Sequence, residues 1–360
     1  MRRFCGLTLA PALLGSASSG QTRAIVQGND DIASVQARRE TETIGTSTAD
    51  EADDIAIWAD TDDPSKSLII GTNKKGGLLV FGLDGHIKTR INAGKVNNVD
   101  LRDRVMIDGQ PRTVVAVSDE NQANAMIALY LLDPATQDLV LLGRVAGGQE
   151  RAYGLCLYQQ AGKLWAFNVF RNGLIEQVAI DVSAGVAHAT HARTMKLKSN
   201  AEGCVVDDRT RTFYAAERDV GIWKWGADPR SSVTPAVVAT ADKQRLVPDV
   251  EGLALAQYGD KGGYLVASSQ GSDTYLVYRL GDDAYMGRFQ ITAGRVDGVS
   301  HTDGIELAIG NLDPEFPGGL FVAQDDDNRP QPQNFKFVAW DEIRKALQLM
   351  PDAPVTDERY

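Results

Sequence analysis

Residues 50–84, DEADDIAIWADTDDPSKSLIIGTNKKGGLLVFGLD, contain the pattern that decides the fold. This stretch holds three short runs rich in β-branched and aromatic residues, at 55–58, 68–71 and 78–81. Such runs are typical of strands when Gly, Asp and Asn separate them. Polar residues stand at the seams between the runs, namely Asp53, Asp54, Asn73, Lys74 and Lys75. The stretch is therefore predicted to form a small antiparallel sheet with polar groups at its turns.

The same pattern returns five more times along the chain. A polar residue introduces the first run of each repeat, at Asp54, Asn98, Tyr153, Glu202, Glu251 and Asp303. These positions are separated by 44, 55, 49, 49 and 52 residues. Repeats of about fifty residues that are built from short strands are typical of propeller blades. The sequence therefore predicts an all-β fold, a six-bladed β-propeller.

The N-terminal segment has the layout of a secretory signal peptide. Two arginines precede an apolar run at 4–14, and small residues follow it. We expect residues 1–24 to be this signal and residues 25–360 to form a single propeller domain that is exported to the periplasm or the medium. A disordered N-terminus is the alternative. No later run is long enough for a membrane span.

The two ends of the chain are expected to complete the ring. Part of the segment 25–49 should pair with the last repeat as an added strand, because a closed propeller brings its two ends together in one blade. Residues 340–350, WDEIRKALQLM, have helical spacing of apolar residues and stop before Pro351. We expect this helix to pack on the rim.

Charge and cysteine content restrict the partners. The chain has a formal net charge of −11 and no basic stripe, which argues against a nucleic-acid partner. We expect a monomer with neither a nucleic-acid nor a membrane partner. Cys156 and Cys204 lie in predicted first strands, where buried free thiols are the expected state. A disulfide is the alternative, because the sequence does not give the distance between them.

Repetition around a ring predicts a polar site at one mouth of the central channel. The six polar residues that introduce the repeats should lie at equal height there, near the polar ends of the middle strands. Carboxylate and amide oxygens suit a hard cation such as Ca²⁺. Lys74, Lys75 and Arg171 beside the acids suit a polyanion. Asp325, in the acidic run 325–328, is a further candidate metal ligand, with a solvated loop as its alternative.

Ten segments, in order, carry a resemblance to a known family. They are DDIAIW, TNKKGGLLVFGLDG, VNNVDLR, YGLCLY, AEGCVVDD, GIWKW, DVEGLAL, GYLVASSQG, HTDGIEL and GGLFVAQD, between about residues 50 and 340. The chain resembles the β-propeller phytases, which are calcium-dependent alkaline phytases of the 3-phytase type. The resemblance implies a six-bladed propeller that hydrolyses phytate (myo-inositol hexakisphosphate), free or bound to calcium, to lower inositol phosphates and orthophosphate by attack of a metal-activated water.

The resemblance also implies roles for individual residues. The implied catalytic residues are Asp53, Glu202, Glu251 and Asp303. The implied ligands of calcium or water are Asp53, Glu202, Asp249, Glu251, Gln270 and Asp303. The implied substrate contacts are Lys74, Lys75, Tyr153 and Arg171. Asp53, rather than its neighbour Asp54, takes the family role, a distinction that counting repeats does not resolve.

Three positions depart from the family pattern. Glu120 stands where the family has an arginine for substrate phosphate, Arg218 replaces the second acid of a Glu-Glu pair, and His301 replaces an aspartate. These departures leave open altered substrate preference or weakened activity. Two other functions remain alternatives: a lactonase-like hydrolase of another ester class, and a non-catalytic propeller that binds calcium or inositol phosphates.

Overall fold

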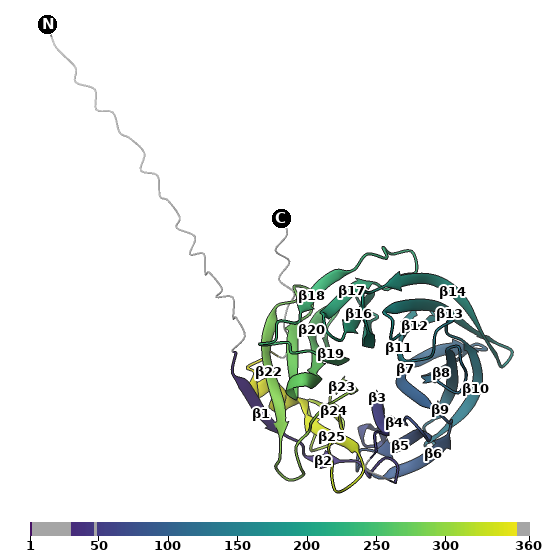
Figure 1. Ribbon diagram of the computed structural model, residues 1–360, viewed down its shortest axis with the longest axis horizontal. Helices are drawn as coiled ribbons and strands as arrows, with labels where there is room; N and C mark the ends of the chain where they lie inside the picture. The colour runs from purple at the N-terminus through teal and green to yellow at the C-terminus, as the bar shows by residue number, and fades with distance from the viewer. Residues whose placement is uncertain (2–29, 47–48, 351–360) are drawn as a thin grey trace.

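The computed structural model describes Met1 and residues 30–46 and 49–350, and they form six sheets arranged around a common centre (Figure 1). This arrangement confirms the predicted six-bladed β-propeller. The predicted signal peptide, apart from Met1, lies outside the described residues. In the part of the chain that the structure describes, no helix is both long enough and apolar enough to cross a membrane.

The first four blades are four-stranded antiparallel sheets whose strands follow one another in the chain. The first blade contains β3 (Ala52–Trp58), β4 (Leu68–Asn73), β5 (Gly77–Gly82) and β6 (Ile87–Asn92). The second contains β7 (Val96–Ile107), β8 (Gln110–Asp119), β9 (Met126–Asp133) and β10 (Asp138–Ala146). The third contains β11 (Gly154–Gln160), β12 (Lys163–Val169), β13 (Leu174–Ser183) and β14 (Val186–Lys196). The fourth contains β15 (Ala201–Asp207), β16 (Thr212–Glu217), β17 (Gly221–Gly226) and β18 (Ala236–Thr240).

The last two blades take strands from the N-terminal segment. The fifth contains β19 (Val250–Tyr258), β20 (Gly262–Ser269), β21 (Thr274–Arg279) and β22 (Tyr285–Thr292). The sixth contains β23 (Ile305–Ile309), β24 (Gly319–Asp325) and β25 (Asn334–Ala339). β2 (Arg39–Glu40) pairs with β25 and closes the ring as predicted. β1 (Ile32–Gln36) adds a parallel fifth strand outside β22, which the sequence did not predict (Figure 1).

Helical structure is confined to short pieces among the described residues. The α-helix α1 (Trp340–Ala346) begins at the predicted residue, and its Trp340 and Ile343 are buried. Two 3-10 turns, η1 (Pro64–Lys66) and η2 (Gln270–Ser272), lie between strands. Because η2 follows β20 directly, it places Gln270 beside the mouth of the channel.

The core lies between neighbouring blades. One cluster packs the third blade on the fourth, where the Phe167 and Phe213 rings stack with their centroids 4.0 Å apart. Cys156 on β11 and Cys204 on β15 form a disulfide across the same seam. The expected pair of free thiols is therefore wrong. The two cysteines lie on adjacent inner strands and both face the seam between the third and fourth blades, and their Cα atoms are 5.8 Å apart, within the usual disulfide range.

Candidate functional site at the mouth of the central channel

The acidic residues at the mouth come from β-bulges at the beginning of the inner strands. The pairing register shifts between Ala52 and Ile55 in β3, between Ala201 and Cys204 in β15, and between Val250 and Leu253 in β19. A bulge places extra residues on one strand and redirects their side chains. Asp53, Glu202 and Glu251 each lie inside such a bulge, so their side chains leave the regular alternation of the strand.

Glycines beside these acids allow neighbouring inner strands to approach closely. The Gly252 amide donates to the Asp303 carbonyl at 2.9 Å, and the Gly304 amide donates to the Asp53 carbonyl at 3.1 Å. A Cβ on Gly203 would lie 2.0 Å from the Glu251 carbonyl oxygen. The repeated acid-glycine pair is therefore a packing requirement as well as a source of carboxylates.

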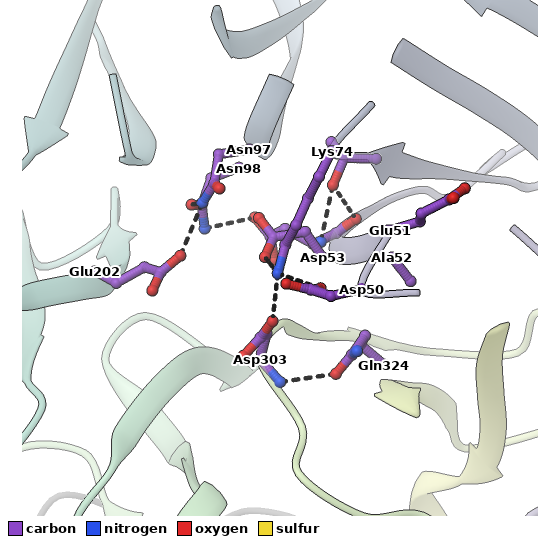
Figure 2. Close-up of polar contacts among 12 residues, drawn as sticks. Asp50, Glu51, Ala52, Asp53, Lys74, Asn97, Asn98, Glu202, Asp303 and Gln324 are labelled. Carbon is purple, nitrogen blue, oxygen red and sulfur yellow. Dashed lines mark hydrogen bonds and ion pairs between the residues drawn. The ribbon is translucent and has the colours of Figure 1, made fainter. Parts of the chain in front are cut away.

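Lys74 joins the carboxylates of the first and sixth blades (Figure 2). Its ammonium lies 2.8 Å from Asp303 Oδ2, 2.8 Å from Asp50 Oδ1 and 3.1 Å from Asp53 Oδ1. The Gln270 amide donates to the other Asp303 oxygen at 2.6 Å. Asp303 is thus held from two sides by residues of the first and fifth blades.

Glu202 is held by the second and third blades. The Asn97 amide donates to Glu202 Oε1 at 2.8 Å (Figure 2), and the Tyr153 hydroxyl also hydrogen-bonds Glu202. The Arg171 guanidinium stacks on the Tyr153 ring, with its central carbon 3.7 Å from the ring centroid. This side of the mouth therefore combines a buried carboxylate with an exposed cation.

Arg218 neutralises the acids of the fifth blade. Its Nε lies 2.8 Å from Glu251 Oε1, and a terminal nitrogen lies 3.2 Å from Asp249 Oδ2. Glu251 is buried, whereas Asp249 is partly exposed at the edge of the mouth. The acid lost from the family pattern at residue 218 is thus replaced by a cation that contacts two of the predicted metal ligands.

These groups surround a cavity of about 300 Å³ that opens at the mouth. The cavity is lined by Asp50, Lys74, Val96, Asn97, Glu120, Tyr153, Arg171, Glu202, Arg218 and Asp303. Below it lies a much smaller cavity of about 10 Å³, a volume on the scale of one water molecule. Its lining includes Asp53, Glu202, Glu251 and Asp303. A polar cavity above a ring of acids can bind an anion and a small cation together.

Burial and mutual repulsion raise the pKa values of the acids in this ring. Burial, followed by the charges of Glu202 and Asp303, raises the pKa of Asp53. Burial and the charge of Asp303 raise the pKa of Glu202, and burial and the charge of Glu202 raise that of Glu251. Burial alone would lower the pKa of Lys74, but Asp53 and Asp303 raise it. A cation among these groups would relieve the repulsion.

The structure brings most of the predicted site residues together. Those around the mouth are Asp53, Glu202, Glu251, Asp303, Lys74, Tyr153 and Arg171, with Asp249 and Gln270 at its edge. Lys75 is half exposed and lies 3.7 Å from Glu51, outside the lining of the cavity. Asp325 is buried on β24, where its Oδ1 accepts from the Ser300 amide and its Oδ2 lies 3.4 Å from the Lys336 ammonium.

Two polar residues of the lining were not predicted. Asp50 contacts Lys74 at the rim, and Asn97 contacts Glu202. A possible signal for Asn97 was the pair Asn97-Asn98, because the register also shifts in β7 between Val96 and Val99. Asn98 instead donates to Asp54 Oδ2 at 3.0 Å, deeper in the channel.

The chemistry of the ring fits a hard cation, although its side chains are not arranged as a closed ligand cage. Within residues 30–46 and 49–350, no group of three or more His, Cys, Asp or Glu side chains is placed to hold a metal ion. Two buried carboxylate oxygens, Asp53 Oδ2 and Glu251 Oε2, nevertheless have no hydrogen-bond partner among the described residues. Oxygen donors of this kind suit Ca²⁺, and the residues therefore fit it by donor chemistry.

Two comparisons with known proteins, a family model and one relative, identify the same family. One solved chain, from "Crystal Structure of Mitotic Checkpoint Complex", aligns with a TM-score of 0.46 and 14% identity, over 88% of this chain and 82% of that chain. The chain is 36% identical to the 3-phytase of Bacillus subtilis (strain 168) over 359 residues, covering 96% of this chain and 94% of that protein. The phytase family model matches residues 5–358. With a family match over nearly its whole length and acids gathered at one mouth of a six-bladed propeller, the chain belongs to the phytase family.

Proposed function

We propose that this protein is an exported, calcium-dependent phosphomonoesterase that releases orthophosphate from phytate. Membership of the phytase family suggests a metal-dependent enzyme. The observation that carries the proposal is the mouth itself, where buried acids lie directly below a cavity lined by Lys74, Arg171 and Arg218. Such a mixture suits a ligand with many phosphates, because the cations of the protein and bound metal share the neutralisation of its charge.

Different side chains bind the substrate and accept the proton. Lys74 and Arg171 bind and orient the phosphates. Glu202 faces the cavity, and burial raises its pKa, which makes the carboxylate a better acceptor for a proton from the attacking water. The water oxygen forms a bond to phosphorus while the bond from phosphorus to the inositol oxygen breaks, and that oxygen takes up a proton as the alcohol leaves.

Calcium is proposed to complete the site. Asp53, Glu202, Asp249, Glu251, Gln270 and Asp303 would hold it. When bound, the ion would neutralise substrate charge and lower the pKa of a water molecule. The support is the donor set, which contains carboxylate and amide oxygens and neither His nor Cys. The layout of residues 1–24 and the Cys156–Cys204 disulfide support export, because disulfides persist in oxidising compartments.

Orthophosphate release from phytate by the purified protein tests this function. We expect release in the presence of Ca²⁺, loss of release with EDTA, and recovery when Ca²⁺ is added back. Glu342→Gln is a control that should release phosphate as wild type does, because Glu342 lies on α1 and pairs with Arg38 away from the mouth. Absence of release from folded, calcium-supplied protein would contradict the proposal, and calcium-dependent phytate binding without turnover would instead favour the non-catalytic alternative.

A further inference from the structure

Two residues of unexpected charge lie on different walls of the same cavity. Glu120 follows β8 in the second blade, and Arg218 follows β16 in the fourth. Both line the cavity of about 300 Å³ above the acidic ring. We infer that Arg218 is a specificity-determining residue that binds substrate phosphate together with Arg171, while Glu120 keeps phosphate away from the second blade. This inference rests on the proposed function.

Arg218 is held in place and still has donors to spare. Its side chain is 23% exposed and is fixed by Glu251 and Asp249, at 2.8 Å and 3.2 Å. A guanidinium has five N–H donors, so these two contacts leave donors for an anion in the cavity that Arg218 lines. Fixed guanidinium groups lose little conformational freedom when they bind phosphate.

Arg171 and Arg218 act on the same part of the cavity. Arg171 stacks on the Tyr153 ring, and Glu251, which pairs with Arg218, raises the pKa of Arg218 against the lowering effect of burial. Both arginines line the cavity with Tyr153. Two guanidinium groups beside one tyrosine form a cationic edge on the third and fourth blades, and guanidinium binds phosphate through paired hydrogen bonds.

Glu120 makes the second blade unfavourable for phosphate. Its Oε2 accepts from Arg151 Nε at 3.0 Å and from a terminal nitrogen of Arg151 at 2.7 Å. The Glu120 side chain is 14% exposed and lines the cavity, whereas Arg151 is 62% exposed and is not part of the lining. Arg151 therefore fixes a carboxylate in the cavity wall, where its charge repels an anion.

The arrangement predicts preference for a ligand with several phosphates. Lys74 lies on the first blade, and the Arg171–Arg218 edge lies on the third and fourth. A ring with several phosphates can present one phosphate to Lys74 and another to the arginines, whereas a monoester presents a single phosphate. Loss of Arg218 should therefore weaken binding of phytate more than binding of p-nitrophenyl phosphate.

Steady-state kinetics of Arg218→Gln with both substrates test the inference. We expect KM for phytate to rise about tenfold, as loss of a charged hydrogen bond predicts, with a smaller change in kcat. KM for p-nitrophenyl phosphate should rise less than KM for phytate, and Arg218→Lys should recover part of the loss. Arg230→Gln is the control, because Arg230 is in the same blade beyond the opposite end of β17 and is 91% exposed.

A second variant distinguishes two roles of Arg218, binding of phosphate and neutralisation of Glu251 and Asp249. In the double variant Glu120→Arg/Arg218→Gln, a positive charge on the facing wall should restore KM for phytate to within about threefold of wild type. A purely structural role for Arg218 would not be rescued from across the cavity. If Arg218→Gln fails to fold, Glu120→Gln alone decides: KM for phytate should fall, and an unchanged KM overturns the inference.

The outcomes also separate this inference from the proposed function. If wild type hydrolyses phytate while Arg218→Gln keeps its KM, the inference fails and the function stands. Equal increases in KM for both substrates would likewise overturn the specificity role. If wild type releases no phosphate from phytate, the proposed function itself fails.

Discussion

Asp53 and Asp54 are neighbours in the chain, yet the bulge in β3 gives them different surroundings. Asp53 contacts Lys74, whereas Asp54 accepts from the Asn98 amide and the Val99 backbone and lines the channel below. Repeat counting locates the pair but not the member that faces the mouth, because the period of a strand does not hold inside a bulge. The resemblance to the family implies the role for Asp53, and Asp53 is the member of the pair that contacts Lys74 at the mouth.

Glu202 and Asp303 supply carboxylates on which the proposed reaction depends. Glu202→Gln and Asp303→Asn each keep the size of the side chain but remove a charge from the acidic ring. We expect at least a tenfold loss of kcat on phytate in each variant, about 1.4 kcal/mol or more in activation free energy. Kinetics at saturating Ca²⁺ measure it, with Glu342→Gln as control. Near-wild-type kcat in both variants would exclude the assigned roles.

Lys74 should act mainly on binding. Lys74→Ala removes a charge that substrate and transition state share, so KM for phytate should rise about three- to tenfold while kcat changes little. The change also leaves Asp50, Asp53 and Asp303 without their shared cation, and calcium binding measured by calorimetry should become tighter. Lys88→Ala, which removes the surface pair with Asp84, is the control. A fall in kcat at constant KM would show that this assignment is wrong.

Among the elements, the sequence predicted three strands of each blade and the added strand of the sixth, but it missed the fourth strand of the first five blades. The inner and middle strands are buried on both faces, so their apolar runs are conspicuous. The outer strand β6, IKTRIN, alternates between exposed and partly buried residues and carries two cations. Its apolar signal is weak because β6 is the outermost strand of the blade, where every residue is exposed or only partly buried. Six-fold repetition was enough to predict the fold without these strands.

Side-chain contacts between elements could not be predicted in the same way. The disulfide depends on the distance between β11 and β15, and the contact of Arg218 with Glu251 depends on how the fourth blade meets the fifth. Both are tertiary distances that repeat arithmetic does not supply. The acids of the inner strands were predictable because the ring places equivalent positions together.

The disulfide should strengthen the seam between the third and fourth blades. It closes a loop between residues 48 positions apart, and such a link typically contributes about 2–4 kcal/mol. We expect Cys156→Ser/Cys204→Ser to lower Tm by about 3–6 °C. Dithiothreitol should lower the Tm of wild type by a similar amount and leave that of the variant unchanged. Equal Tm values for oxidised and reduced wild type would contradict this role.

At the scale of the whole molecule, the channel below the mouth carries a second set of charges. A cavity of about 320 Å³ is lined by apolar side chains together with Asp54, Asp100, Arg102, Asp208 and Glu306. Burial, with the charge of Asp100, raises the pKa of Glu306 to about 8. Burial also raises the pKa of Asp54 to about 7. The channel therefore holds acids that bind protons more tightly in the folded chain than in the unfolded chain.

This difference predicts how stability depends on pH. The pKa of Glu306 rises from 4.5 to about 8 on folding, so its contribution to stability falls as pH rises through that interval. Glu306→Gln cannot ionise. The Tm of the variant minus the Tm of wild type should therefore increase from pH 5 to pH 8. Thermal unfolding at several pH values measures this, with Glu342→Gln, at a partly exposed position on α1, as control. A difference in Tm that stays constant with pH would refute the assignment.

We propose that the acidic mouth of this propeller hydrolyses phytate with calcium. The most direct measurement is a calcium titration of the metal-stripped protein in which orthophosphate release from phytate is followed at each concentration, beside Glu202→Gln. We predict no release without metal, a saturable increase with Ca²⁺ in wild type, and at least a tenfold lower plateau in the variant. Release that is independent of Ca²⁺, or equal in the two proteins, would contradict calcium-dependent hydrolysis at this mouth.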